Sequence, residues 1–168
     1  MAVVDSAAAG LRSASRATIL QLRAPRLSGR ELEHEAAALV AGSSVPVIVS
    51  SRCDVALAVG AAGVNLPGLD ISARAARVLM RERLVGRSVH SLDEAVQAER
   101  EGADFVIFGP VWPSPSHPHA PAAGPRALAE LARAIRIQVV AIGGVTPARV
   151  AECRTAGAAG YAAISMFK

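Results

Sequence analysis

Short apolar runs rich in Val and Ile alternate along the chain with segments of helical periodicity, and this alternation is what most constrains the fold. The strand-like runs cover residues 2–4, 18–22, 45–49, 63–66, 84–88, 105–108, 138–142 and 160–164. The helical segments between them cover residues 6–16, 28–41, 53–61, 72–82, 92–101, 125–135 and 147–156. Strict alternation predicts parallel strands joined by crossover helices.

Two architectures fit this order, an open doubly wound sheet and a closed barrel, and the count of eight strands favours a compact (βα)8 TIM barrel. The first strand is not followed by the G-x-G-x-x-G turn that would support a dinucleotide-binding sheet. The chain has 168 residues, whereas such barrels usually have about 250. We therefore expect one domain over residues 1–168, with the eighth helix missing or reduced.

Several helix ends carry local signals. Ser28 and Ser91 each precede a glutamate at capping-box spacing, and Thr146 precedes a proline. Gly102 and Gly157 follow helical segments, where glycine ends a helix without steric cost.

The charge composition excludes several functions. The net charge is +4, but Lys168 is the only lysine, so the chain has neither an internal Schiff-base lysine nor a P-loop. The arginines are spread along the chain and aromatic residues make up 3%, which argues against a nucleic-acid partner. Apolar runs are too short for a membrane span, which needs about 18 residues or more.

Features of the N-terminus and the cysteines bear on location. The first residues lack the basic and apolar regions of a secretory signal. Cys53 and Cys153 are not spaced as a disulfide framework or a zinc site, and we interpret them as small apolar fillers. We expect a cytoplasmic protein.

The carboxyl ends of the last two strands suggest an anion site. Gly143 and Gly144 end one strand just before a helical segment, and Ile164 and Ser165 end the next. Glycines let backbone N–H groups approach an anion, and a helix N-terminus adds positive potential. In TIM barrels the loops after strands seven and eight commonly bind phosphate. A tight turn without a ligand is the alternative for the double glycine.

Several sequence motifs together resemble those of the thiamine phosphate synthase/TenI superfamily. They are Gln21-Leu22-Arg23, the segment from Gly86 to Pro110, Ala141-Ile142-Gly143-Gly144 and Gly157-Ala158-Ala159-Gly160, and they cover nearly the whole chain in order. The resemblance is closest to the TenI branch. It implies a (βα)8 barrel that binds a thiazole phosphate. Synthases join this molecule to a pyrimidine pyrophosphate with Mg²⁺, whereas TenI-type tautomerases convert a thiazole carboxylate phosphate to its aromatic isomer.

Departures from the family pattern separate these activities. Pro25 stands where synthases have a pyrophosphate-binding lysine, Ser51 where they have the first Mg²⁺ carboxylate, and His117 where they have a second lysine. Asp70 matches the second metal aspartate. A leaving pyrophosphate needs cations, so these losses favour a tautomerase, which needs only a phosphate site and one base.

Our main hypothesis is therefore a TenI-like isomerase of thiamine biosynthesis. Arg23 would meet the carboxylate and His117 would carry the proton, although the tautomerase histidine at the end of strand six is Pro110 here. We expect His90 to serve as a helix cap. The phosphate and substrate would be bound by Gln21, Arg23, Ser88, Gly109, Ser114, Ser116, Gly143, Gly144, Ile164 and Ser165.

Two alternatives remain open. One is a weak Mg²⁺-dependent synthase using Asp70, Arg26 and Arg52, and the other is a non-catalytic regulatory barrel that binds thiazole phosphate. The isomerase would need no cofactor, and Mg²⁺ would be required only by a synthase. A missing eighth helix would expose apolar surface on the last strand and on the first and seventh helices, so we expect a homo-oligomer.

Overall fold

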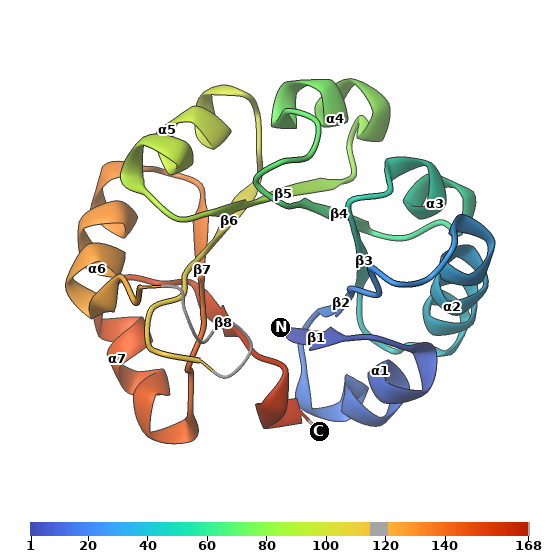
Figure 1. The fold of residues 1–168 in the computed structure, drawn as a ribbon, viewed down its shortest axis with the longest axis horizontal. Coiled ribbons are helices and arrows are strands. Elements are labelled where there is room, and N and C mark those ends of the chain that lie inside the picture. Colours follow the sequence, from blue (N-terminus) through green and yellow to red (C-terminus); the bar gives the residue numbers. More distant parts are fainter. Residues whose placement is uncertain (115–120, 168) are drawn as a thin grey trace.

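Eight parallel strands form one sheet that closes into a barrel surrounded by helices in the computed structural model, which describes residues 1–114 and 121–167 (Figure 1). The strands are β1 (Ala2–Val4), β2 (Leu20–Leu22), β3 (Val47–Ser50), β4 (Gly63–Leu66), β5 (Leu84–Val89), β6 (Phe105–Phe108), β7 (Gln138–Ile142) and β8 (Gly160–Ala162). Each strand pairs with the next in parallel. The predicted TIM-barrel fold is confirmed.

The barrel closes through a bridge between β1 and the residue after β8, and through a hydrogen bond from the Met1 amino group to the Tyr161 carbonyl at 2.8 Å. Ala2 pairs with Ala163, and the backbone N–H of Val3 donates to the carbonyl of Ala163 at 3.0 Å. The N–H of Ala163 donates in turn to the carbonyl of Met1 at 3.2 Å. These bonds join the two edges, so no long unpaired strand edge is left there.

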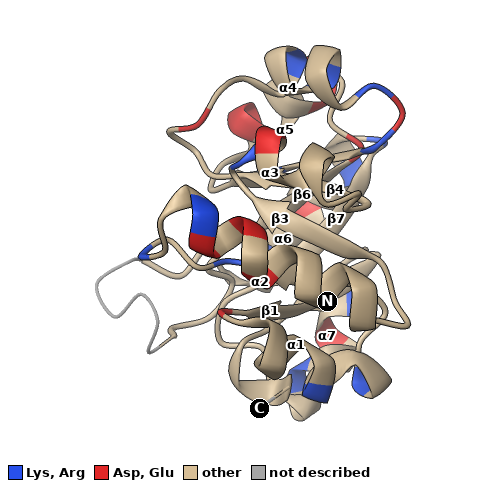
Figure 2. Ribbon diagram, turned by 90° about the vertical axis from the view of Figure 1, so that its right-hand side faces the viewer, with Lys and Arg blue, Asp and Glu red and all other residues tan. Residues whose placement is uncertain are grey.

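The helices lie outside this ring. They are α1 (Ala7–Ser13), α2 (Gly29–Gly42), α3 (Cys53–Ala58), α4 (Ala73–Met80), α5 (Leu92–Arg100), α6 (Gly124–Ala134) and α7 (Val150–Thr155), with 3-10 turns η1 (Ala14–Arg16), η2 (Pro147–Arg149) and η3 (Ser165–Phe167). Figure 2 shows that charges of both signs lie mainly on the helices and the loops that connect them. Among the described residues, no helix is long and apolar enough to cross a membrane.

The capping signals explain where most helices begin. Ser28 and Glu31 form the predicted capping box at the start of α2. At α5, the hydroxyl of Ser91 accepts from the N–H of Glu94, but the Glu94 carboxylate accepts from the N–H of His90 and not from that of Ser91. Gly102 and Gly157 have the positive φ of helix-ending glycines, at 86° and 89°.

The segment after β7 differs from the expected helix. It begins with the turn η2 and continues as a helix of six residues, and the hydroxyl of Thr146 makes no capping hydrogen bond. Pro147 lies at the first position of η2, where its missing N–H costs nothing.

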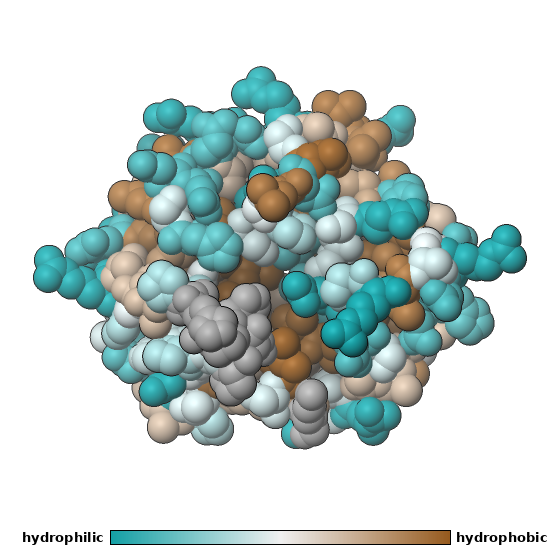
Figure 3. All heavy atoms as spheres, in the orientation of Figure 1, coloured by the Kyte–Doolittle hydropathy of each residue, from teal (hydrophilic) through white to brown (hydrophobic). Residues whose placement is uncertain are grey.

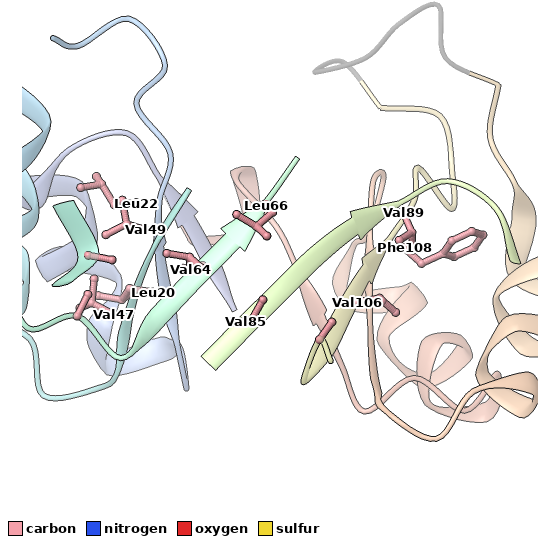
Figure 4. Packing of buried hydrophobic residues seen from close by; sticks show 14 of the residues in the cluster. Leu20, Leu22, Val47, Val49, Val64, Leu66, Val85, Val89, Val106 and Phe108 are labelled. Atoms are coloured by element: carbon pink, nitrogen blue, oxygen red, sulfur yellow. The ribbon is translucent and has the colours of Figure 1, made fainter. Parts of the chain in front are cut away.

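The strands pack a core on each of their two faces. Alternate side chains from β2 to β6, labelled in Figure 4, belong to one buried cluster that also includes helix residues such as Leu32, Ala36 and Leu39. The intervening side chains of Ile48, Phe105 and Ile107 form a second cluster. The period of two along each strand therefore separates a layer under the helices from a layer inside the barrel.

The turn η3 follows β8 and packs against the start of the barrel. The buried ring of Phe167 stacks on Tyr161 with centroids 6.3 Å apart. The Phe167 carbonyl accepts hydrogen bonds from Ser13 at 2.8 Å and from Arg16 at 2.7 Å. This turn covers part of the apolar surface beside α1 and β8 that we expected to be exposed.

Candidate functional site

A cavity of about 660 Å³ opens at the carboxyl ends of the strands. Residues from all eight strands or from the loops that follow them line it. In Figure 3 this face is hollowed near its centre, with hydrophobic atoms in the depth of the hollow and hydrophilic atoms beside it. Carboxyl-end cavities of this kind hold the active sites of TIM barrels.

The wall formed by β2 to β5 is polar and ordered. Gln21 Nε2 donates to Ser50 Oγ at 2.7 Å, and Asn65 Nδ2 donates to Ser88 Oγ at 3.0 Å. Gln21 is 3% exposed and Asn65 is 2% exposed, yet Gln21 Oε1 and Asn65 Oδ1 have no hydrogen-bond partner among the described residues. Buried polar atoms are normally satisfied, so these two oxygens are candidate acceptors for a ligand once a small side-chain movement exposes them.

The strand residues of the opposite wall are apolar, whereas the loops above them carry polar groups such as Arg149 and Ser165. Ile107 and Ile142 line it together with Val3 and Ala162. A cavity with one apolar and one hydrogen-bonding wall suits a flat heteroaromatic ring whose edge carries polar atoms.

The loop after β7 depends on its two glycines. Gly143 has a φ of 92° and Gly144 a φ of 62°. A Cβ on Gly143 would lie 2.6 Å from Pro110 Cα, and one on Gly144 would lie 2.6 Å from the Pro113 carbonyl oxygen. The N–H of Trp112 donates to the Gly143 carbonyl at 3.1 Å and ties this loop to the one after β6. Both conformation and space therefore require glycine.

Most of the predicted binding residues meet in this cavity. Its lining includes Gln21, Arg23, Ser88, Gly109, Ser114, Gly143, Gly144, Ile164 and Ser165. Ser116 and His117 lie outside the described residues. Asp70 lines an adjoining cleft of about 520 Å³ instead.

Asn65 and Arg149 were not assigned to the site from the sequence, and His90 was underestimated. Arg149 lines the cavity next to the double glycine, at the end of η2. His90, which we expected only as a helix cap, also lines it, and its Nδ1 lies 2.6 Å from the Gly109 carbonyl oxygen. A carbonyl only accepts, so Nδ1 carries the hydrogen and Nε2 of the neutral ring is left as an acceptor.

Arg52 does not contribute a cation to the cavity lining. It pairs with Asp54 at 2.5 Å, and the Asp54 side chain is 65% exposed. This hydrogen-bonded arginine lowers the pKa of Asp54 to about 2. Because the pair is exposed to solvent, it adds little to stability.

Both cysteines are buried. Burial raises the pKa of the Cys53 thiol, and Asp70 and Asp54 raise it further. Burial also raises the pKa of Cys153. Neither thiol has the lowered pKa of a catalytic cysteine.

A Mg²⁺ ion fits the described residues poorly. They contain no group of three or more His, Cys, Asp or Glu side chains that could hold a metal. Asp70 lines the smaller cleft with Asp93, Glu94 and Glu101, but no three of these carboxylates are placed to hold one ion. Asp70 Oδ1 accepts from the N–H of Ile71 at 2.7 Å. Mg²⁺ needs six ligands in near-ideal octahedral geometry, and the described residues do not supply enough of them.

Comparisons with known proteins agree with this arrangement. The model of a family described as "Thiamine monophosphate synthase" matches residues 1–167. The chain is 39% identical over 168 residues to the thiamine-phosphate synthase of Chloroflexus aurantiacus, covering 98% of this chain and 76% of that protein. It is 41% identical over 162 residues to the thiamine-phosphate synthase of Methanoculleus marisnigri, covering 94% and 77%.

A solved structure shows the same architecture. The thiamine phosphate pyrophosphorylase from Pyrococcus furiosus superposes with a TM-score of 0.88 at 30% identity, covering 98% of this chain and 84% of that one. The sequence match and the superposed structure both indicate the same family. The chain belongs to the thiamine monophosphate synthase family.

Proposed function

We propose that this barrel binds a thiazole phosphate at its mouth and acts in thiamine biosynthesis as a thiamine-phosphate synthase. The proposal rests mainly on the cavity, because residues from the sequence motifs of the family line it together with the glycine loop after β7. Relatives with about 40% identity over nearly the whole chain bear the name of that synthase, such as the protein of Methanoculleus marisnigri. This favours the coupling reaction over the isomerisation that the sequence analysis placed first.

Different residues of the cavity would bind different parts of the two substrates. The backbone around Gly143, Gly144 and Ser165 would hold the phosphoryl group, and the apolar wall would hold the thiazole ring. Gln21 Oε1 and Asn65 Oδ1 would accept hydrogen bonds from the pyrimidine partner. Arg23, exposed at the end of β2, would face the negative charge of the leaving pyrophosphate.

A coupling assay tests this proposal. Purified protein is mixed with the pyrimidine pyrophosphate, thiazole phosphate and Mg²⁺, and thiamine phosphate is separated by chromatography and measured. We expect product to form in proportion to enzyme. An Arg23→Met variant should lose activity by about 100-fold or more, as is common when a charge-stabilising donor is removed. Background levels of product at high wild-type concentration would contradict a synthase function.

A tautomerase is a second candidate, supported by His90 and by the cations lost at Pro25 and His117. The fixed Nδ1–H of His90 turns Nε2 into a positioned base at the cavity wall. Isomerisation of the thiazole carboxylate phosphate, followed spectroscopically, should then fall in a His90→Gln variant. If this reaction stays at background while coupling is robust, the isomerase hypothesis is wrong.

A further inference from the structure

The glycine loop after β7 supplies hydrogen-bond donors but no formal charge. A phosphate monoester carries almost two negative charges at neutral pH. Moving such an anion into a partly enclosed cavity is costly unless a cation meets it. The helix that follows cannot make up the difference, because it begins as the turn η2 and its α-helical part has only six residues.

Arg149 is the cation next to this loop. It lines the cavity together with Gly143 and Gly144 and is half-buried. Its Nη1 donates to the Gly144 carbonyl at 2.7 Å, and its guanidinium carbon lies 5.1 Å from the centroid of the Trp112 ring. The aromatic face and the carbonyl together fix the orientation of the planar guanidinium group.

We infer that Arg149 is the charged ligand of the phosphoryl group in this chain, held ready by Trp112 and Gly144. The hydrogen bond to Gly144 occupies one N–H group, and a guanidinium has several more. It can therefore keep its bond to the loop and still donate to a phosphate oxygen. The inference rests on the proposed function, because it names the cation of the same phosphate site.

A purely structural function is the competing explanation. Arg149 could merely brace the loop against Trp112, and its loss would then weaken every ligand equally. The test must therefore compare ligands that differ only in the phosphoryl group. Thiazole phosphate and the corresponding thiazole alcohol form such a pair, and inorganic phosphate probes the anion alone.

Calorimetric titration of three variants makes this comparison. Arg149→Met removes the charge and keeps most of the apolar stem, while Arg149→Lys keeps the charge without the planar fork. Arg154→Met serves as the control, since Arg154 lies exposed on α7 and does not line the cavity. We expect Arg149→Met to weaken thiazole phosphate by about 10- to 100-fold, the range of a charge-assisted hydrogen bond.

The alcohol should bind Arg149→Met and wild type within a factor of about two, and Arg149→Lys should lie between wild type and Arg149→Met for thiazole phosphate. Trp112 is the only tryptophan, so inorganic phosphate should also change the intrinsic fluorescence of the wild-type protein and not that of Arg149→Met. Unchanged phosphate affinity in Arg149→Met would overturn the inference, as would an equal loss for the alcohol or the absence of any wild-type response to inorganic phosphate. A failed coupling assay alongside Arg149-dependent phosphate binding would reject the synthase function alone.

Discussion

Single residues set the chemistry of the cavity. Gln21 and Asn65 are buried, and each gives its amide N–H to a serine, while their oxygens have no partner among the described residues. Gly143 and Gly144 hold a backbone path that a side chain would block. We therefore expect the ring to lie beside the polar wall of β2 to β5. We expect the phosphoryl group to lie at the glycine loop after β7.

The Gly144→Ala variant tests the glycine loop. The new Cβ would lie 2.6 Å from the Pro113 carbonyl oxygen at a φ of 62°. Left-handed backbone alone costs a non-glycine residue about 1–2 kcal/mol. We expect a loss of at least that size in urea unfolding and weaker binding of thiazole phosphate in calorimetry. Gly160→Ala is the control, because its Cβ would meet nothing within 4 Å. Wild-type binding by Gly144→Ala would contradict a phosphate site in this loop.

The cysteines give a prediction that depends on pH. Burial raises the pKa of both Cys53 and Cys153, so less thiolate forms in the folded protein than in the unfolded chain at pH 8. A colorimetric disulfide reagent should label both thiols only as fast as the protein unfolds, and rapidly in urea. Fast labelling of the native protein would show that a thiol is accessible and reactive.

The part of the site that could not be predicted from the sequence also consists of single residues. The family motifs were sufficient to predict that Gln21, Ser88 and Ser165 lie in one cavity. They could not single out Arg149, because an arginine after a Thr-Pro turn looks like any surface arginine until the loop after β6 brings Trp112 against it. His90 was assigned as a cap from its neighbours, and only the fold shows its ring at the cavity.

At the scale of elements, periodicity predicted the strands and helices, and packing decided where they end. β8 stops at Ala162, before the predicted 164, because Ala163 forms only the closing bridge to β1. The predicted helix over 147–156 starts as a 3-10 turn, since Thr146 does not cap it. Such boundaries depend on tertiary contacts that a single sequence does not display.

The contact between β5 and β6 is testable in the same way. A Cβ on Gly86 would lie 2.1 Å from Phe105 Cζ, so the ring occupies the space that a side chain on β5 would need. We expect Gly86→Ala to lower the free energy of unfolding by about 1–3 kcal/mol through overpacking. Adding Phe105→Leu should restore part of this loss in a double-mutant cycle measured by urea unfolding. Simple additivity of the two changes would contradict the close packing.

At the scale of the whole molecule, all eight strands belong to one sheet, and short loops connect the strands with the helices around them. We propose that residues 1–168 form one folding unit, which predicts a single cooperative transition in urea followed by both fluorescence and circular dichroism. Two separated transitions would show that the chain contains more than one domain.

Oligomerisation also belongs to this scale. Phe167 is buried, and the most exposed large apolar side chains among the described residues are Leu69, Val78 and Leu79, on or before α4. The homo-oligomer stays a prediction, now with this apolar surface as an added reason. Sedimentation velocity at micromolar concentration should show a dimer, and a monomer at every concentration would contradict it.

The central claim is that a ligand's phosphoryl group binds between the loops after β7 and β8. A crystal structure with bound thiazole phosphate tests this most directly. We predict that the phosphate oxygens lie within hydrogen-bond distance of backbone N–H groups at Gly144 and Ser165, with the Arg149 guanidinium beside them. A phosphoryl group bound instead at Arg23, or in the cleft lined by Asp70, would contradict the account.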